Sequence, residues 1–303
     1  MNIGSSDSEV RKLMSRILAA QCPTYPTTEP RLGTAITEAI GHPGRLVRAE
    51  MVIQASSQHG LRAEVGEQLA CAIEYWHQAS LILDDLPCMD DAQERRGLPC
   101  VHLKHGESIA ILAALALVNR AYSLVQAAYL MESAAVRATA AELVDRALGA
   151  GGILCGQAWD LTFSLGESAP REVGRIAERK TGPLLWLALC LPVLLSDKWP
   201  QERHPLRALS IYWSLAFQAM DDLVDVTATF SATGKTTGRD AVLSRPNLTL
   251  ALGDLVSRQR ISRLLRLADK QIRGLCSRDR TWTYLADWHE RLFLARYRRL
   301  TAA

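Results

Sequence analysis

Two clusters of aspartates are the residues of this sequence best suited to carry chemistry. One is the run Asp84-Asp85-Leu86-Pro87-Cys88-Met89-Asp90-Asp91, and the other is Asp221-Asp222-Leu223-Val224-Asp225. Both lie in apolar segments, where carboxylates are costly unless a cation compensates them. Their ligand atoms are all oxygen, which Mg²⁺ prefers, and that ion fills its remaining positions with water and substrate phosphates. The clusters therefore predict magnesium bound together with a diphosphate substrate.

Helical spacing indicates that the aspartates within each cluster lie close together. In the second cluster, separations of three and four residues allow one helix face to present Asp221, Asp222 and Asp225. Pro87 cannot continue a regular helix, so the first run should bend there and bring Asp90 back beside Asp84. A solvated helix end is the alternative for either pair alone, but two clusters in apolar helices favour the metal site.

Basic residues near these clusters are consistent with a phosphate-bearing substrate. Arg95-Arg96-Gly97 follows the first cluster directly, and Lys180-Thr181-Gly182 and Lys235 lie near predicted helix ends or in loops. Arginine makes bidentate contacts to phosphate, and lysine acts as a point charge. Each alone would be ordinary surface charge, but beside the aspartates they strengthen the prediction of a diphosphate site.

The elements that must position these residues are predicted to be helices. Ala-, Leu-, Gln- and Glu-rich composition indicates helices over Val65–Leu83, Ser108–Met131, Ala134–Gly149 and Leu206–Val226. Ile109–Val118 and Leu184–Leu195 are apolar most of the way round, which is typical of helices in the middle of a bundle. No repeat or long linker divides the chain. We therefore expect one all-α domain over residues 1–303, with residues 1–30 as a loosely packed N-terminal leader.

Composition excludes several classes of protein. Apolar residues make up 48% of the chain and charged residues 22%, so a disordered chain is not expected. The net charge of +3 comes without a basic run interleaved with aromatics, so nucleic-acid binding is not expected. Seven cysteines without CxxC or Cys/His ligand spacing predict neither a disulfide framework nor a zinc site.

The hydrophobic pattern favours a cytoplasmic protein. The first residues lack the apolar segment of a signal peptide. The longest apolar run, Leu184–Leu195, has 12 residues, whereas a membrane-spanning helix needs about 20. The sequence therefore predicts a cytoplasmic protein without stable membrane insertion.

The motifs together resemble those of the trans-isoprenyl diphosphate synthases, also called polyprenyl synthetases. The first cluster with its Arg95-Arg96-Gly97 tail resembles the family's DDxxxxD motif, and Phe217-Gln218 through Asp225 resembles the second motif, FQxxDDxxD. The family's other motifs follow in the expected order, at Gly156-Gln157-Ala158-Trp159-Asp160, Lys180-Thr181, Gly234-Lys235 and Gly238-Arg239-Asp240. The match runs from about Pro43 to Asn247 and is most similar to bacterial geranylgeranyl diphosphate synthases.

The resemblance implies a single large helical bundle with a central active-site cavity, assembled as a homodimer. It implies condensation of isopentenyl diphosphate with an allylic diphosphate (dimethylallyl, geranyl or farnesyl) to geranylgeranyl diphosphate, with roughly two or three Mg²⁺ ions per site. Residues implied in catalysis are Asp84, Asp85, Asp90, Lys180, Asp221 and Asp222. Implied metal ligands are Asp84, Asp90, Asp221, Asp222 and Asp225. The allylic substrate would be bound by Arg95, Lys180, Thr181, Gln218 and Lys235, and isopentenyl diphosphate by Arg45, Arg48, His77 and Arg96.

Product length is expected to depend on the residues that precede the first cluster. Ala79, five residues before Asp84, is small, whereas related farnesyl synthases carry an aromatic residue there, which implies a product longer than C15. Ser80 follows it, and Trp76, nearly one helical turn deeper, could form the floor of the product tunnel. Simple core packing is the alternative for Trp76.

Two positions depart from the family pattern. The usual GKRxRP reads Gly44-Arg45-Leu46-Val47-Arg48-Ala49, so the middle arginine is replaced by Leu46. Leu115 stands where the family usually has an acid. Both aspartate clusters are complete.

Three other functions remain as alternatives. A farnesyl diphosphate synthase, with a C15 product, would use the same motifs. A class I terpene cyclase normally has one aspartate-rich motif with an Asn/Ser/Glu triad, and it has no use for the cations that would bind isopentenyl diphosphate. A non-catalytic partner subunit would be marked by loss of a cluster, and neither is lost.

Overall fold

The computed structural model describes residues 3–164, 169–227 and 245–302, so Lys235 lies outside the described residues. The regular elements of the described chain are helices, together with one short antiparallel hairpin in which Glu94–Arg95 (β1) pairs with Leu98–Pro99 (β2). The predicted all-α class is therefore confirmed. Contacts divide the chain into two compact units, Met1–Ala140 and Ala141–Ala303. A single domain over residues 1–303 stays a prediction.

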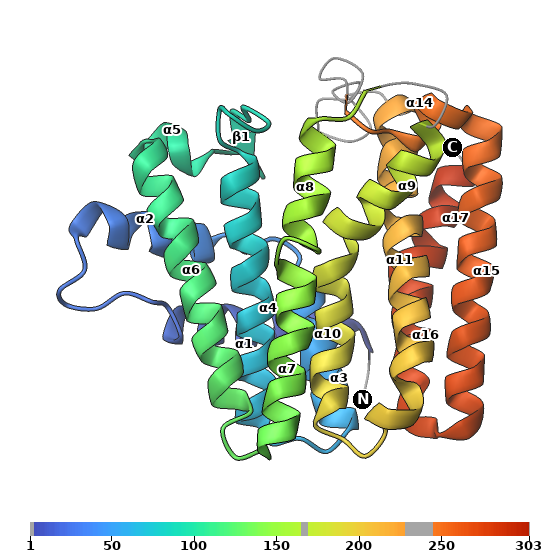
Figure 1. The fold of residues 1–303 in the computed structure, drawn as a ribbon, viewed down its shortest axis with the longest axis horizontal. Coiled ribbons are helices and arrows are strands. Elements are labelled where there is room, and N and C mark those ends of the chain that lie inside the picture. Colours follow the sequence, from blue (N-terminus) through green and yellow to red (C-terminus); the bar gives the residue numbers. More distant parts are fainter. Residues whose placement is uncertain (1–2, 165–168, 228–244, 303) are drawn as a thin grey trace. The chain divides into compact units, whose positions relative to one another are not determined.

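The first unit is built around two long helices, α4 and α6. Its helices are α1 (Ile3–Ala20), α2 (Pro30–Gly41), α3 (Val47–Gln58), α4 (Ala63–Asp84), α5 (Val101–His105), α6 (Glu107–Ala128) and the beginning of α7 (Ala134–Leu148). α4 and α6 lie side by side (Figure 1). Four successive α4 residues, Ala70, Cys71, Ala72 and Ile73, have no exposed surface, so this helix is buried on all sides there. It ends at the first aspartate cluster.

The N-terminal segment is packed rather than forming the loose leader expected for residues 1–30. α1 contacts α2, α3 and α4. Its residues Met14, Ile17 and Leu18 are buried, at the three- and four-residue spacing of an apolar helix face. The Tyr75 hydroxyl of α4 donates to the Leu18 carbonyl at 2.6 Å. This spacing was the sequence signal for a docked helix.

α6 has an exposed apolar face, so the prediction that Ile109–Val118 lies in the middle of a bundle is wrong for that face. The exposed fractions of Ile111, Leu112 and Leu115 are 39%, 49% and 55%. By length and composition, α6 is also the one helix in the described ranges that could cross a membrane, with 39% of its most apolar window buried. A core helix of a water-soluble protein passes the same test. The exposure of this apolar face of α6 to solvent therefore needs an explanation.

The second unit is a set of helices packed around α11. Its elements are α8 (Ile153–Leu161), α9 (Ala169–Lys180), α10 (Gly182–Leu194), α11 (Trp199–Thr227), α14 (Leu248–Leu252), α15 (Asp254–Arg278), η1 (Arg280–Trp282), α16 (Thr283–Trp288), the π-helix η2 (His289–Leu294) and α17 (Ala295–Ala302). α11 packs against α10 and α15. α10 is buried almost throughout, as its apolar sequence predicts. All seven cysteines of the chain are free.

Candidate active site

Asp84 and Asp90 come together at the carboxyl end of α4. The helix ends at Asp84, three residues before Pro87. The chain then reverses, and the backbone N–H of Asp90 donates to the Asp84 carbonyl at 3.0 Å. The bend predicted near Pro87 is therefore present. Both aspartates are partly exposed, so their side chains are accessible to a cation from solvent.

Asp85 lies differently from these two aspartates. It is 3% exposed, and its carboxylate accepts three hydrogen bonds from the guanidinium of Arg95, at 2.5, 2.7 and 2.9 Å. A bidentate pair of this kind fixes the plane of the guanidinium. Although burial opposes the charge, the hydrogen bonds that Arg95 donates to Asp85 raise the pKa of Arg95. Asp85 therefore positions Arg95, which strand β1 carries, beside the first cluster.

The loop between α2 and α3 carries Arg45 and is shaped by Arg96. Arg96 donates to the His42 carbonyl at 2.5 Å. Gly44 has φ +72°, a conformation in which any other residue would be strained, and a Cβ there would lie 2.4 Å from the Arg96 Cζ. Leu46 is 2% exposed with φ 53°, so the residue that replaces the family's middle arginine is a core residue of this loop. Arg45 itself is exposed.

A buried carboxylate that the sequence analysis missed lies among the residues expected to bind isopentenyl diphosphate. Glu74 of α4 is 1% exposed and accepts a hydrogen bond from Gln78 Nε2 at 3.2 Å. Burial raises the pKa of Glu74 to about 7, against the opposing charges of Arg48 and Arg96. The sequence signal was a single acid within the apolar stretch from Leu69 to Trp76 of this helix, three residues before His77.

The same electrostatics make His77 a neutral group. Burial, followed by the charges of Arg48, Arg96 and Arg95, holds the pKa of His77 well below its usual value. At neutral pH this imidazole is therefore uncharged, and the cationic charge of the predicted isopentenyl diphosphate site comes from arginines. In the first unit, Arg48 and Arg96 are close enough to act on both Glu74 and His77.

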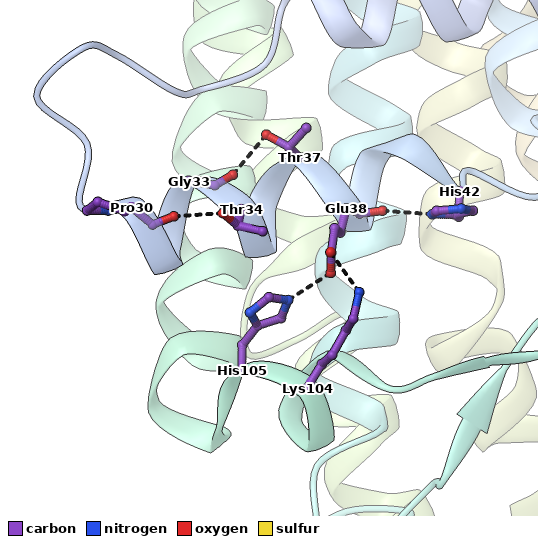
Figure 2. Close-up of polar contacts among 8 residues, drawn as sticks. All are labelled: Pro30, Gly33, Thr34, Thr37, Glu38, His42, Lys104 and His105. Carbon is purple, nitrogen blue, oxygen red and sulfur yellow. Dashed lines mark hydrogen bonds and ion pairs between the residues drawn. The ribbon is translucent and has the colours of Figure 1, made fainter.

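The end of α2 that leads into this loop is held by α5. In Figure 2, Lys104 and His105 of α5 point to Glu38 of α2, and Lys104 Nζ lies 2.7 Å and His105 Nε2 2.8 Å from the Glu38 carboxylate oxygens. Hydrogen bonds from Lys104 and His105 lower the pKa of Glu38. His42 Nδ1 lies 3.2 Å from the Glu38 carbonyl on the same helix. These contacts fix where the chain leaves α2 for the Arg45 loop.

The three residues expected to control product length lie on α4 in different settings. Ala79 is 1% exposed and Trp76 is 4% exposed. The Trp76 ring meets Tyr122 of α6 edge to face, with centroids 5.3 Å apart. Ser80 donates its hydroxyl to the His77 carbonyl at 2.9 Å, so its polar group is used within the helix. Trp76 and Ala79 are both buried, which fits a tunnel lining and core packing equally.

In the second unit, Asp222 is separated from the other two aspartates of its cluster. Asp222 is 1% exposed, and its two carboxylate oxygens accept from Gln218 Nε2 at 2.8 Å and from the Leu248 N–H at 2.7 Å. Asp221 and Asp225 are partly exposed. The three aspartates expected on one face are therefore divided between a buried side and an accessible side of α11. Asp222 secures the start of α14, where Asn247 caps the helix.

The predicted allylic-site residues of the second unit form two contacts. Thr181 Oγ1 donates to Gln218 Oε1 at 3.1 Å, which extends the chain of hydrogen bonds through Gln218 to Asp222. Lys180 Nζ lies 2.8 Å from Asp160 Oδ2, and Asp160 is 8% exposed. Asp160 also pairs with Arg245 at 3.7 Å. Arg245 was missed because nothing in its local sequence marks it as a site residue.

Gly156 allows α8 to approach the residues that carry Lys180. A Cβ at this glycine would lie 2.5 Å from the carbonyl carbon of Arg179 and from the backbone nitrogen of Lys180. Such a distance is shorter than any ordinary van der Waals contact, so glycine is required by close backbone approach. The glycine of the Gly156-Gln157 motif thus sets the position of the Lys180 backbone.

Asp221 already interacts with a cation in this structure. Its Oδ1 forms an ion pair with Arg296 of α17. The exposed fraction of the Asp221 side chain is 44%, and that of Arg296 is 21%. A carboxylate that accepts a guanidinium here is placed to accept a metal cation in the same position. No group of three or more candidate ligand side chains gathers in the parts of the chain that are described.

The donor chemistry of both clusters fits Mg²⁺. Accessible carboxylates are present at Asp84 and Asp90 in one unit and at Asp221 and Asp225 in the other. Mg²⁺ commonly binds through one or two carboxylates and keeps its other positions for water and phosphate oxygens. A pair of aspartates in each unit is therefore a sufficient protein contribution.

Comparison with known proteins identifies the class. The polyprenyl synthetase family model matches residues 29–270. The geranylgeranyl diphosphate synthase of Pseudescherichia vulneris is 33% identical over 265 residues, covering 84% of each chain. That of Pantoea ananas is 30% identical over 267 residues, covering 87% of this chain and 86% of the relative. The chain belongs to the polyprenyl synthetase family and is a prenyltransferase that uses isoprenyl diphosphates.

Solved structures agree on the fold. A Zymomonas mobilis FPP/GFPP synthase has a TM-score of 0.80 at 25% identity, covering 95% of this chain and 98% of that chain. A Helicobacter pylori geranyltransferase, solved with magnesium and isoprenyl diphosphate, has a TM-score of 0.79 at 22% identity, covering 94% and 95%. This chain therefore has the all-α fold of the isoprenoid synthases.

Proposed function

We propose that this prenyltransferase is a geranylgeranyl diphosphate synthase, which extends an allylic diphosphate with isopentenyl diphosphate to a C20 product. The observation that carries the proposal is Ala79, a small buried residue on α4, five residues before Asp84. A small residue there leaves room for a growing chain beneath the first cluster. Two relatives at 30% and 33% identity are themselves named geranylgeranyl diphosphate synthases.

The aspartates are assigned to the metal that binds the allylic diphosphate. Asp84, Asp90, Asp221 and Asp225 would hold Mg²⁺, which neutralises the departing diphosphate when it is bound. Asp85 orients Arg95, and Asp222 holds Gln218, so these two carboxylates act as positioning residues.

Cationic side chains are assigned to the two diphosphates. Arg95 and Lys180, each held by a buried aspartate, would contact the allylic diphosphate, together with Thr181, Gln218 and Lys235. Arg45, Arg48 and Arg96 would bind isopentenyl diphosphate, with His77 donating a hydrogen bond as a neutral imidazole. Donors that are fixed before the substrate binds stabilise developing charge without reorganisation.

The reaction itself needs little further help from side chains. The allylic carbon–oxygen bond ionises, and the diphosphate departs with the bonding electrons. The double bond of isopentenyl diphosphate attacks the carbocation, and a proton then leaves, with the departed diphosphate as the base. The apolar, buried surroundings of Ala79 and Trp76 would exclude water, which would otherwise quench the cation.

Product analysis tests the proposal. The purified protein would be incubated with isopentenyl diphosphate, Mg²⁺ and dimethylallyl, geranyl or farnesyl diphosphate in turn, and the prenyl chain lengths determined by mass spectrometry. A dominant C20 product is expected with each primer. A C15 stop would favour the farnesyl synthase alternative, for which the FPP/GFPP name of the Zymomonas neighbour is a supporting observation. If no condensation occurs with any primer, the non-catalytic subunit becomes the favoured function. If the product is a cyclised hydrocarbon, the terpene cyclase does.

Trp76→Ala is expected to lengthen the products beyond C20. Removal of the indole would open the space beneath Ala79, because Trp76 lies three residues deeper in α4 and is 4% exposed. The product distribution of Trp76→Ala would be compared with that of Trp186→Ala, which removes a buried tryptophan from α10 instead. If Trp76→Ala still makes only C20, Trp76 is a core residue with no part in setting length.

A second copy of the chain is the proposed partner of the exposed apolar face of α6. Ile111, Leu115 and Tyr122 are spaced by four and seven residues, so they lie along one stripe of the helix, and each is exposed. Helices with such a stripe pair in a self-complementary way about a two-fold axis. The stripe would then be covered by protein rather than lipid, in keeping with the predicted cytoplasmic location.

Leu115→Glu is expected to convert the homodimer to a monomer. It places two like charges at the proposed interface, one from each copy, where burial without a partner is costly. Multi-angle light scattering after gel filtration would give the mass, with Leu130→Glu as the control because Leu130 is also exposed but lies outside α6. A wild-type chain that already runs as a monomer would refute the dimer.

A further inference from the structure

The ion pair between Arg296 and Asp221 joins α17 to the second aspartate cluster. The Arg296 guanidinium contacts Asp221 Oδ1 and lies 4.9 Å from the centroid of the Phe217 ring on the preceding turn of α11. One side chain thus packs on two residues of the FQxxDDxxD motif at once. Its exposed fraction of 21% indicates a contact that is partly shielded from water.

The elements before Arg296 hold it in this position. The π-helix η2 (His289–Leu294) precedes α17, and its extra residue per turn changes the direction in which the following side chains point. Phe293 of η2 stacks on Trp213 of α11 at 5.1 Å, and Trp213 Nε1 donates to His289 Nδ1 at 3.0 Å. π-helical turns are frequent at functional sites.

α17 is also anchored on its other side. Tyr297 donates its hydroxyl to the Arg258 carbonyl of α15 at 2.9 Å, and Arg258 donates from its guanidinium to the Leu300 carbonyl at 2.7 Å. Both bonds involve residues of α17 that follow Arg296 in the sequence. The guanidinium is therefore presented to Asp221 by a fixed helix rather than by a freely moving tail.

A guanidinium at Asp221 Oδ1 and a divalent cation on the same carboxylate would repel each other, so the two compete for its negative charge. We propose that Arg296 is the resident counter-ion of Asp221 and competes with the divalent cation for it, and so sets the metal concentration at which the second cluster fills. The inference rests on the proposed function, since it assumes that Asp221 is a metal ligand. Arg296 then keeps the metal-free cluster neutralised and yields the carboxylate when metal binds.

The test measures metal binding without substrate. Mn²⁺ would be titrated into the metal-free protein, and the free ion quantified by electron paramagnetic resonance. Arg296→Gln is expected to lower the Kd for Mn²⁺ by up to about fivefold, the upper end of the range for an exposed ion pair. Arg298→Gln is the matched control, because Arg298 also lies on α17 but pairs with Glu290. Its Kd should equal that of the wild type.

Asp221→Asn separates failure of this inference from failure of the proposed function. If Asp221→Asn weakens Mn²⁺ binding but Arg296→Gln leaves the Kd unchanged, the competition is refuted and the metal assignment stands. If Asp221→Asn itself has no effect on Mn²⁺ binding, the metal assignment fails, and the competition fails with it. In the double variant, the effect of Arg296→Gln should disappear.

Stability gives a second readout. In EDTA, Arg296→Gln should lower the Tm, because Asp221 loses its counter-ion, and saturating Mn²⁺ should raise the Tm of the variant more than that of the wild type. Should Arg296→Gln fail to fold, Arg296→Met keeps an unbranched stem to pack over Phe217 and replaces it in both measurements. Equal metal-induced shifts for variant and wild type would overturn the proposal.

Discussion

Replacement of Asp84 by Asn should lower kcat/KM by about 10²- to 10³-fold, the largest catalytic loss expected from any single substitution in this chain. Asp84 ends α4 and lies beside Asp90 through the backbone hydrogen bond between them, so it is placed to hold the metal of the first cluster. Asn keeps the shape and removes the charge that neutralises a divalent cation. Steady-state kinetics with geranyl diphosphate as primer would measure the loss at saturating Mg²⁺.

Asp91→Asn is the matched control for this substitution. Asp91 belongs to the same acidic run, but it is exposed and is not assigned to the metal. Its replacement should change kcat/KM less than about threefold, since it removes only a solvent-screened charge. Comparable losses for both variants would mean that the run acts through its total charge, and the assignment of Asp84 as a ligand would have to be abandoned.

Gly156→Ala should give a large loss of stability, with the free energy of unfolding falling by about 1–3 kcal/mol. The added Cβ would lie 2.5 Å from the backbone of Arg179 and Lys180, and backbone cannot move aside as a flexible side chain does. Alanine favours a helix by about 1 kcal/mol over glycine, so the measured loss already includes that gain. Urea unfolding followed by circular dichroism would give the value.

Gly151→Ala separates the effect of the close approach from that of the glycine itself. A Cβ at Gly151 meets nothing within 4 Å, so the unfolding midpoint should stay close to that of the wild type. Gly156→Ala should also reduce activity, because Lys180 is displaced from its ion pair with Asp160. Equal stability of the two variants would show that α8 can move away without cost.

The helices that position the site could be predicted from local sequence. α4 and α10 are long apolar segments, and their helical character needs no information about their partners. The docking of α1 was missed, although Met14, Ile17 and Leu18 carry the spacing of an apolar face. The exposed face of α6 could not be predicted, since an all-apolar helix does not reveal which of its sides lacks a neighbour.

The site was predicted in part, for a similar reason. The motifs supplied the candidate residues, and the bend that brings Asp90 beside Asp84 followed from Pro87. Spacing alone could not show that Asp222 turns away from the other two aspartates to bind Gln218 and the backbone of Leu248. Leu248, at the start of α14, lies more than twenty residues further along the chain. The partner of Asp221, Arg296, is separated from it by a still longer stretch.

Glu74 would make substrate binding at the proposed isopentenyl diphosphate site depend on pH. Its pKa of about 7 means that this carboxyl is close to half ionised at neutral pH. A diphosphate bound by Arg48 and Arg96 would bring negative charge near it, favour its neutral form and raise its pKa further. Substrate binding would therefore take up part of a proton from the buffer. The heat of binding measured by calorimetry should therefore differ between phosphate and Tris buffers. The difference should equal the fraction of a proton taken up, multiplied by the difference between the ionisation enthalpies of the two buffers.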